Sequence, residues 1–155
     1  MLYGGTGSYS RQQTMPPELP DRLEAGTLNV PGYAGLREGL RYIRNAGTEK
    51  LFRREHTLLE RCVRGMHKAG MQVFSGGYQA STVSFRCGLD CEEAAAILAG
   101  KGIAVRSGLH CAPFAHESAG TLETGTVRVS IGYDTFEEEI TKFLRAILKL
   151  PRFSE

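Results

Sequence analysis

Gly125-Thr-Val-Arg-Val-Ser-Ile-Gly-Tyr133 is the stretch of this 155-residue sequence that decides its fold. Apolar side chains occupy alternate positions from Val127 onward, and Arg128 and Ser130 occupy the positions between them. Alternation of this kind predicts a strand with one buried face. A charge on such a strand needs a partner, so Arg128 either makes a structural ion pair with Asp or Glu or binds an anion.

The preceding loop, Arg106-Ser-Gly-Leu-His-Cys-Ala-Pro-Phe-Ala-His116, holds a thiol, Cys111, next to His110. The thiol lies between two arginines, Arg106 and Arg128, that end or lie in predicted strands. Planar guanidinium groups bind both oxygens of a carboxylate, and a cysteine near fixed positive charge is a candidate nucleophile. The working hypothesis is therefore a thiol that attacks a small carboxylic acid.

Each of these side chains also has a structural interpretation. Cys111 could be a small buried apolar residue, which is the usual position of a free cysteine. Arg106 is either a second anion contact or a brace for the loop. His110 either adjusts the reactivity of the thiol or hydrogen-bonds the loop backbone. His116 is expected to be structural or exposed to solvent.

Outside the loop, capping residues and apolar periodicity predict an α+β fold. Helices are expected from Pro31 to about Gly47, from a Thr48 cap to Gly70, from an Asp90–Glu93 capping box to Gly100, and from a Thr135–Glu138 capping box to Pro151. Strands are expected near residues 71–74, 81–86, 103–106 and 126–133. Cys62 lies on the apolar face of the second helix, and Phe136 and Leu148 belong to the apolar stripe of the last one. This order predicts helices that cover one side of a small, mostly antiparallel sheet.

Residues 1–30 do not look like a self-sufficient fold, because their glycines and prolines are typical of loops. The first helix then carries Gly32, Gly35 and Gly39. Glycine costs about 1 kcal/mol relative to alanine at a helical position. Three glycines on one short stretch therefore predict that another segment packs close to the backbone on that side.

The composition is ordinary for a globular protein, with 41% hydrophobic residues, 23% charged residues and a net charge of +2. The basic residues are scattered among acidic ones, which favours a solvated surface over a nucleic-acid site. No apolar run approaches the roughly 20 residues of a membrane span, and no signal peptide is evident, so we expect a cytoplasmic protein without a membrane partner. Cys87-x-x-x-Cys91 lacks a second ligand pair, so the four cysteines predict reduced thiols and no metal site.

Several motifs carry a family resemblance. The R-S-G-x-H-C-A loop and the G-T-V-R-x-S-x-G-Y strand resemble the C-terminal part of cysteine desulfurases that depend on pyridoxal phosphate (PLP), in the class V aminotransferase superfamily. Gly4-Gly-Thr-Gly7 and Glu24-Ala-Gly-Thr27-Leu-Asn-Val-Pro-Gly32 resemble the same family in the same order. The resemblance implies that residues 48–155 form the small C-terminal domain of a fold-type I PLP enzyme. Residues 1–47 would then be the tail of its large domain and a connecting helix.

The resemblance also implies roles for single residues. Cys111 would attack the sulfur of PLP-bound cysteine, take it as a persulfide and leave alanine, while Arg128 would bind the substrate carboxylate. Thr27 would reach across a dimer interface to the PLP phosphate of the partner subunit, with Gly5 and Thr6 at the same interface. The implied partners are L-cysteine or L-selenocysteine, a second copy of the protein, and a sulfur-acceptor protein of iron–sulfur cluster assembly.

The main PLP site of the family pattern is missing, namely its lysine, the aspartate on the pyridine nitrogen, the ring-stacking histidine and the main phosphate cradle. Family members carry the PLP lysine in a Ser/Gly-x-His-Lys segment, and His67-Lys68 mimics that segment only at the end of an amphipathic helix. The chain is therefore expected to be the C-terminal portion of a desulfurase, inactive alone and unable to hold PLP covalently. The alternatives are a portion of a selenocysteine lyase or class V aminotransferase, or a non-catalytic module for dimerisation or sulfur transport.

Overall fold

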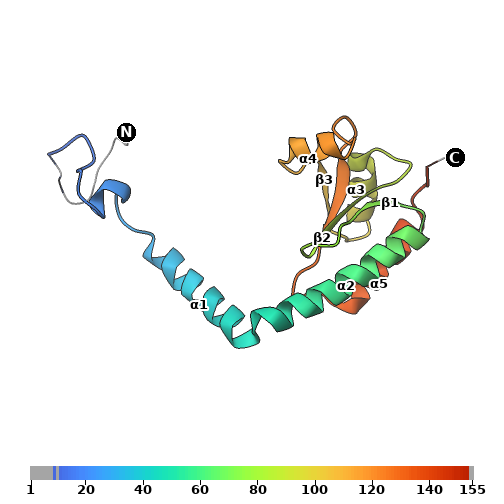
Figure 1. The fold of residues 1–155 in the computed structure, drawn as a ribbon, viewed down its shortest axis with the longest axis horizontal. Coiled ribbons are helices and arrows are strands. Elements are labelled where there is room, and N and C mark those ends of the chain that lie inside the picture. Colours follow the sequence, from blue (N-terminus) through green and yellow to red (C-terminus); the bar gives the residue numbers. More distant parts are fainter. Residues whose placement is uncertain (1–8, 10, 154–155) are drawn as a thin grey trace. The chain divides into compact units, whose positions relative to one another are not determined.

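The computed structural model describes residue 9 and residues 11–153, and the chain divides between Gly47 and Thr48 into two compact units. The first unit holds a 3-10 helix, Asp21–Leu23, and helix α1, Val30–Ala46 (Figure 1). The assignment of the two units to a large and a small domain stays a prediction. No helix in the described part of the chain is both long and apolar enough to cross a membrane.

Helix α1 begins and ends at residues that the sequence marks. The Asn29 side chain accepts a hydrogen bond of 2.9 Å from the Gly32 amide, and Gly47 ends the helix with a φ of 84°. A side chain at position 32 would collide with the Asn29 cap, which explains this glycine. At Gly35 and Gly39 an added Cβ would meet nothing within 4 Å among the described residues, so the close packing expected at these glycines is not formed there.

The second unit is built on a four-stranded antiparallel sheet. The strands are β1, Gln72–Phe74; β2, Thr82–Arg86; β3, Arg106–Gly108; and β4, Thr126–Ser130. Their order in the sheet is β1-β2-β4-β3, so β4 is an inner strand although it comes last in the sequence. Strand β4 therefore joins the β1–β2 pair to strand β3.

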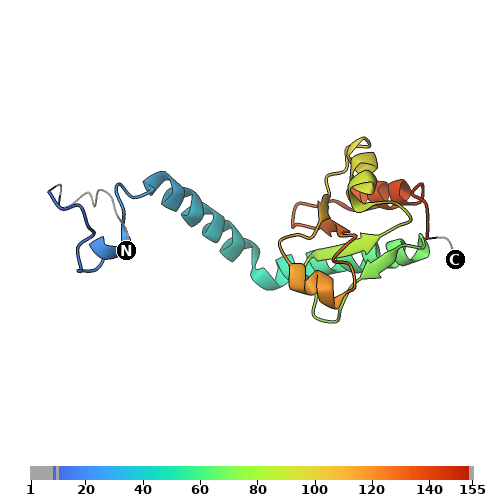
Figure 2. The same ribbon diagram turned by 90° about the horizontal axis from the view of Figure 1, so that it is seen from above.

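Four helices accompany this sheet: α2, Thr48–Lys68; α3, Cys91–Ala99; α4, Pro113–Ser118; and α5, Glu137–Ile147. Helix α5 packs against α2 and α3, while α2 contacts strands β1 and β2 and α3 contacts β3 and β4 (Figures 1 and 2). Inward-facing Val83 and Phe85 of β2 and Val127 and Val129 of β4 are buried beneath them. The α+β fold predicted from the sequence, with helices on one side of a small antiparallel sheet, is confirmed.

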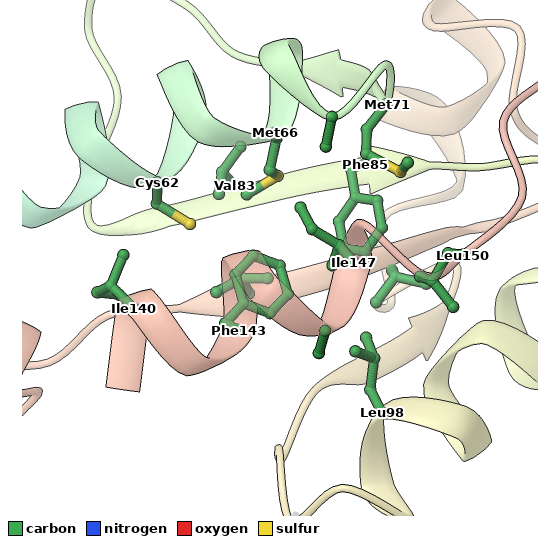
Figure 3. Packing of buried hydrophobic residues seen from close by; sticks show 14 of the residues in the cluster. Cys62, Met66, Met71, Val83, Phe85, Leu98, Ile140, Phe143, Ile147 and Leu150 are labelled. Carbon is green, nitrogen blue, oxygen red and sulfur yellow. The ribbon is translucent and has the colours of Figure 1, made fainter. Parts of the chain in front are cut away.

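The core lies between the sheet and helices α2 and α5 (Figure 3). The ring of Phe85 is fully buried and meets the ring of Phe143 edge to face, with centroids 5.9 Å apart. Cys62 is also fully buried, as its place on the apolar face of α2 predicted. Burial raises the pKa of the Cys62 thiol to about 12, so this cysteine is a packing group and no nucleophile.

The structure corrects several predictions, and strand β4 also ends at Ser130 and not at Tyr133. Strand β3 begins at Arg106 and not at residue 103, because its pairing partners in β4 begin opposite Arg106. The last helix is capped by the Glu139 carboxylate, which accepts a hydrogen bond of 2.8 Å from the Phe136 amide. The predicted capping box, Thr135–Glu138, was therefore wrong by one residue. Phe136 and Leu148 are 61% and 60% exposed and do not belong to the buried stripe. Helix α4, directly after the Cys111 loop, was not predicted.

Replacement of Phe85 by alanine should strongly destabilise the second unit. Removal of a fully buried aromatic ring that packs on Phe143 costs about 3–5 kcal/mol of unfolding free energy. The exposed ring of Phe136 provides the matched control, and Phe136→Ala should cost well under 1 kcal/mol by the usual size of surface changes. Urea unfolding followed by circular dichroism measures both variants, and equal losses would contradict this core.

Candidate functional site

The open face of the sheet carries a row of side chains in register. Ser84 of β2 lies opposite Arg128 of β4, and Arg128 lies opposite Arg106 of β3. Neighbouring Val127 and Val129 are 1% and 8% exposed on the covered face, so alternation places Arg128 on the other one. The two arginines predicted to flank the thiol are therefore cross-strand neighbours.

Arg128 has the properties of an anion receptor. Its side chain is half-buried, and its Nε atom is buried without a hydrogen-bond partner. Within residues 11–153 no carboxylate lies within ion-pair distance of Arg128, so the alternative of a structural ion pair is not observed. Buried donors are normally satisfied, so an unpaired guanidinium nitrogen beside a second arginine favours a bound anion.

The Cys111 loop presents its thiol to solvent. Cys111 is exposed, and Nη2 of Arg106 lies 3.7 Å from its Sγ atom. Arg106 thus contacts the thiol directly, which was not among the roles expected for it. His110 and Cys111 both have a positive φ, 54° and 59°. Non-glycine residues rarely adopt this left-handed conformation, and strained residues of this kind concentrate at functional sites.

The four cysteines of the chain differ in what their surroundings permit. Cys62 and Cys87 are buried, Cys91 is half-buried, and Cys111 is exposed. Burial raises the pKa of Cys87, as it does that of Cys62, so both thiols stay protonated at neutral pH. The structural interpretation of Cys111 as a buried apolar residue is therefore wrong.

His110 contacts strand β4. Its Nε2 atom lies 3.0 Å from Oγ1 of Thr126, while its Nδ1 atom is buried without a partner. The pKa of His110 is lowered, first by burial and then by the positive charges of Arg128 and Arg106 and by His116. His110 is therefore neutral at neutral pH, and its side chain binds a threonine hydroxyl of the next strand.

His116 is 7% exposed, so of the two expectations for this residue the structural one is confirmed. Its Nδ1 atom lies 2.8 Å from Oγ1 of Thr121, a residue that the sequence analysis did not single out. Thr126 was missed in the same way. Helix α4 had a local signal, because Pro113 suits the first turn of a helix. The two threonines had none, because the sequence does not show that they face histidines.

Two glycines allow β3 and β4 to approach each other at this end. Gly125 has a φ of 61°, and a Cβ added there would lie 3.0 Å from the Cα of Gly108. It would also lie 2.9 Å from the Sγ of Cys91. The glycine of the G-T-V-R motif therefore lets the chain turn into β4 with the backbone of β3 alongside.

The remaining predicted cofactor residues belong to the sequence before the unit that carries this site. Thr27 is exposed in the turn before α1, in the other unit, and Gly5 and Thr6 lie outside the described residues. None of the five lysines belongs to a strand of the sheet; they are Lys50 and Lys68 in α2, Lys101 after α3, Lys142 in α5 and Lys149 after it. Residues 11–153 also contain no cluster of three or more side chains that could hold a metal ion.

The chain resembles known proteins over most of its length. Residues 1–143 match the family model described as aminotransferase class-V. A probable cysteine desulfurase of Xylella fastidiosa is 37% identical over 134 residues, which are 84% of this chain and 32% of that protein. A probable cysteine desulfurase of Mycolicibacterium paratuberculosis is 41% identical over 135 residues, 84% of this chain and 19% of that protein.

A solved structure shows the same likeness. The apo structure of a cysteine desulfurase from Thermococcus onnurineus superposes with a TM-score of 0.81 at 34% identity, over 96% of this chain and 38% of that one. The chain thus spans about a third or less of the length of the two curated relatives.

Acid should destabilise the second unit in part through His110. Because its pKa is lowered in the folded state, the unfolded chain takes up the proton first. The stabilisation is fully present above the ordinary pKa of 6.5 and is lost as the pH falls through the lowered value. His110→Gln removes this contribution, so the fall of unfolding free energy below pH 6.5 should become shallower. Urea unfolding at a series of pH values measures the unfolding free energy of each variant, with exposed His67→Gln as the control. If the unfolding free energy of His110→Gln falls with pH as steeply as that of the unmodified protein, the prediction is contradicted.

Proposed function

The chain belongs to the class V aminotransferase family, and on that premise we propose that it is part of a cysteine desulfurase. The enzyme would convert L-cysteine into L-alanine and hold the sulfur as a persulfide on Cys111. One observation carries the proposal: the exposed Cys111 thiol lies beside a guanidinium, next to a second arginine whose Nε has no partner. A thiol nucleophile and a carboxylate receptor are the two groups that this chain's part of the reaction needs.

Arg128 is the proposed receptor for the substrate carboxylate. Its guanidinium projects from an inner strand, so its Cα is held by pairing on both sides, with Ser84 and with Arg106. A charge-assisted, bidentate contact would satisfy the unpaired Nε atom. The bound amino acid would then lie over the open face of the sheet, on which Arg106 also lies.

Cys111 is the proposed sulfur acceptor. Its thiolate attacks the sulfur of L-cysteine; a sulfur–sulfur bond forms, and the carbon–sulfur bond breaks with its electron pair left on the β carbon. Protonation of that carbon gives L-alanine, and Cys111 keeps the terminal sulfur. Arg106 at 3.7 Å supplies positive charge next to the sulfur that carries the negative charge before attack.

PLP is the proposed cofactor of the complete enzyme, in which it supplies an electron sink for the breaking bond. We propose that the chain alone does not hold PLP covalently and is inactive, because its one His-Lys pair, His67-Lys68, lies in the last turn of helix α2. Thr27, Gly5 and Thr6 are proposed to approach the cofactor of a partner subunit in a homodimer. A sulfur-acceptor protein, as in iron–sulfur cluster assembly, would remove the persulfide sulfur. The cytoplasm is the proposed compartment, because four free cysteines suit a reducing environment.

Replacement of Cys111 by alanine should stop sulfur transfer and leave substrate binding intact. Both arginines remain in the variant, so a full-length protein that contains it should still bind L-cysteine with unchanged affinity. Mass spectrometry should find a persulfide on Cys111 of the unmodified protein after addition of L-cysteine, and alanine formation should fall to background in the variant. Half-buried Cys91→Ala is the matched control and should keep its activity. Normal alanine production by Cys111→Ala would refute the nucleophile assignment.

Replacement of Arg128 by alanine should instead weaken binding. Loss of a charge-assisted hydrogen bond costs about 1.5–3 kcal/mol, which is roughly a tenfold to hundredfold rise in the dissociation constant. Arg128→Lys should recover only part of the affinity, because a point charge cannot replace the planar fork. Exposed Arg145→Ala on α5 serves as the control. Titration of L-cysteine measures all three, and a full recovery by lysine would argue against bidentate binding.

A further inference from the structure

Two histidine–threonine pairs lie behind the loop that carries Cys111. His110 Nε2 is 3.0 Å from Thr126 Oγ1, and His116 Nδ1 is 2.8 Å from Thr121 Oγ1. The two imidazole rings are neighbours, with centroids 5.6 Å apart. Thr121 and Thr126 are each 2% exposed, and His116 is 7% exposed. Three side chains of this His–Thr cluster are thus buried, while His110 is half-buried and joins the two pairs through its ring contact with His116.

Backbone hydrogen bonds tie the cluster to both ends of the segment. The amide of Thr121 donates a hydrogen bond of 2.8 Å to the carbonyl oxygen of His116, at the end of helix α4. The amide of Gly125, just before strand β4, donates a hydrogen bond of 2.9 Å to the carbonyl oxygen of Thr121. Thr121 therefore connects the helix that follows the Cys111 loop with the strand that carries Arg128.

The backbone next to the cluster is strained. His110 and Cys111 adopt left-handed conformations one after the other, with φ values of 54° and 59°. A non-glycine residue stays in this region only where its surroundings hold it there. The His110 side chain is held from β4 by Thr126 and lies against the ring of His116. The Ala112 amide also donates a hydrogen bond of 2.9 Å to the Leu109 carbonyl oxygen and closes this turn, so the cluster holds the turn through the His110 side chain in addition to the backbone.

We propose that His116 and Thr121 are positioning residues for Cys111. They act through His110: their hydrogen bond fixes the His116 ring, this ring packs on His110, and His110 keeps the left-handed turn that brings the Cys111 thiol to Arg106. Neither residue touches the substrate. The inference rests on the proposed role of Cys111 as the sulfur acceptor.

Removal of the Thr121 hydroxyl should separate positioning from binding. Thr121→Val keeps the shape of the side chain but leaves His116 Nδ1 buried without a partner. The loop should then lose its fixed conformation and the thiol its place beside Arg106. Arg128 is held in β4 by strand pairing and should keep its affinity for L-cysteine.

The experiment compares Thr121→Val with Thr121→Ser, which restores the hydroxyl, and with Thr82→Val at an exposed position of β2 as the matched control. Amide hydrogen exchange of the whole chain, read by mass spectrometry, reports the loop at residues 109–121 and the core strand at residues 82–86. In a full-length protein that contains the chain, persulfide formation on Cys111 is measured against L-cysteine concentration.

In Thr121→Val, exchange at 109–121 should rise about tenfold, kcat for persulfide formation should fall by a similar factor, and KM and exchange at 82–86 should not change. In Thr121→Ser, the exchange rate and kcat should each stay within about twofold of the unmodified protein, well below the tenfold change expected for Thr121→Val. Unchanged exchange in Thr121→Val, or equal damage in the serine variant, overturns the proposal.

Two further outcomes are decisive. If the unmodified protein forms no persulfide on Cys111 while Thr121→Val still loosens the loop, the proposed function fails and the His–Thr cluster is confirmed only as a loop anchor. If Thr121→Val unfolds the unit, seen as fast exchange at 82–86, His116→Asn and His116→Leu decide instead. Asparagine places a polar atom near the position of Nδ1 and leucine does not, so equal loop exchange in these two variants overturns the proposal.

Discussion

Burial of Val127 and Val129 is the constraint on which the rest of the structure depends. Strand β4 is an inner strand, and helices α2, α3 and α5 cover only one face of the sheet. Because side chains alternate along a strand, burial of the two valines directs Arg128 to the open face. The hydrophobic core therefore sets the direction of Arg128, the one arginine of the described residues whose buried nitrogen has no partner. A shift of one residue in register would bury its charge.

The reactive loop depends on a second constraint, which is geometric. Glycines at 108 and 125 let the ends of β3 and β4 pass within contact of each other, and the loop between them turns through two left-handed residues. The same turn leaves Cys111 exposed while Cys62 and Cys87 are buried with raised pKa values. Burial thus disfavours thiol chemistry at Cys62 and Cys87, and the exposed thiol of Cys111 lies beside a guanidinium.

Much of this could be predicted locally. The alternation at 126–133, the glycine at 70 and the cap at Asp90 are signals within a few residues, and the structure has a strand, a helix end and a helix start at these places, although the strand ends at Ser130. Boundaries failed where a distant segment decides them. Strand β3 begins at Arg106 because its pairing with β4 starts at the pair Arg106 and Arg128. The residues around 103 do not encode where this pairing starts. The glycines of α1 predicted a neighbour that no described residue provides.

The sequence by itself determined the secondary structure elements other than helix α4, and it determined the burial of Cys62. It also identified Cys111, Arg106 and Arg128 as candidate functional residues, since periodicity, capping and residue chemistry are local properties. Only the tertiary structure decided that Arg106 lies at the thiol, that His116 is buried, and that Thr121 and Thr126 bind the two histidines. These contacts join segments that the chain separates by a loop or a helix. Their partners are selected by strand register and packing, which no short stretch of sequence contains.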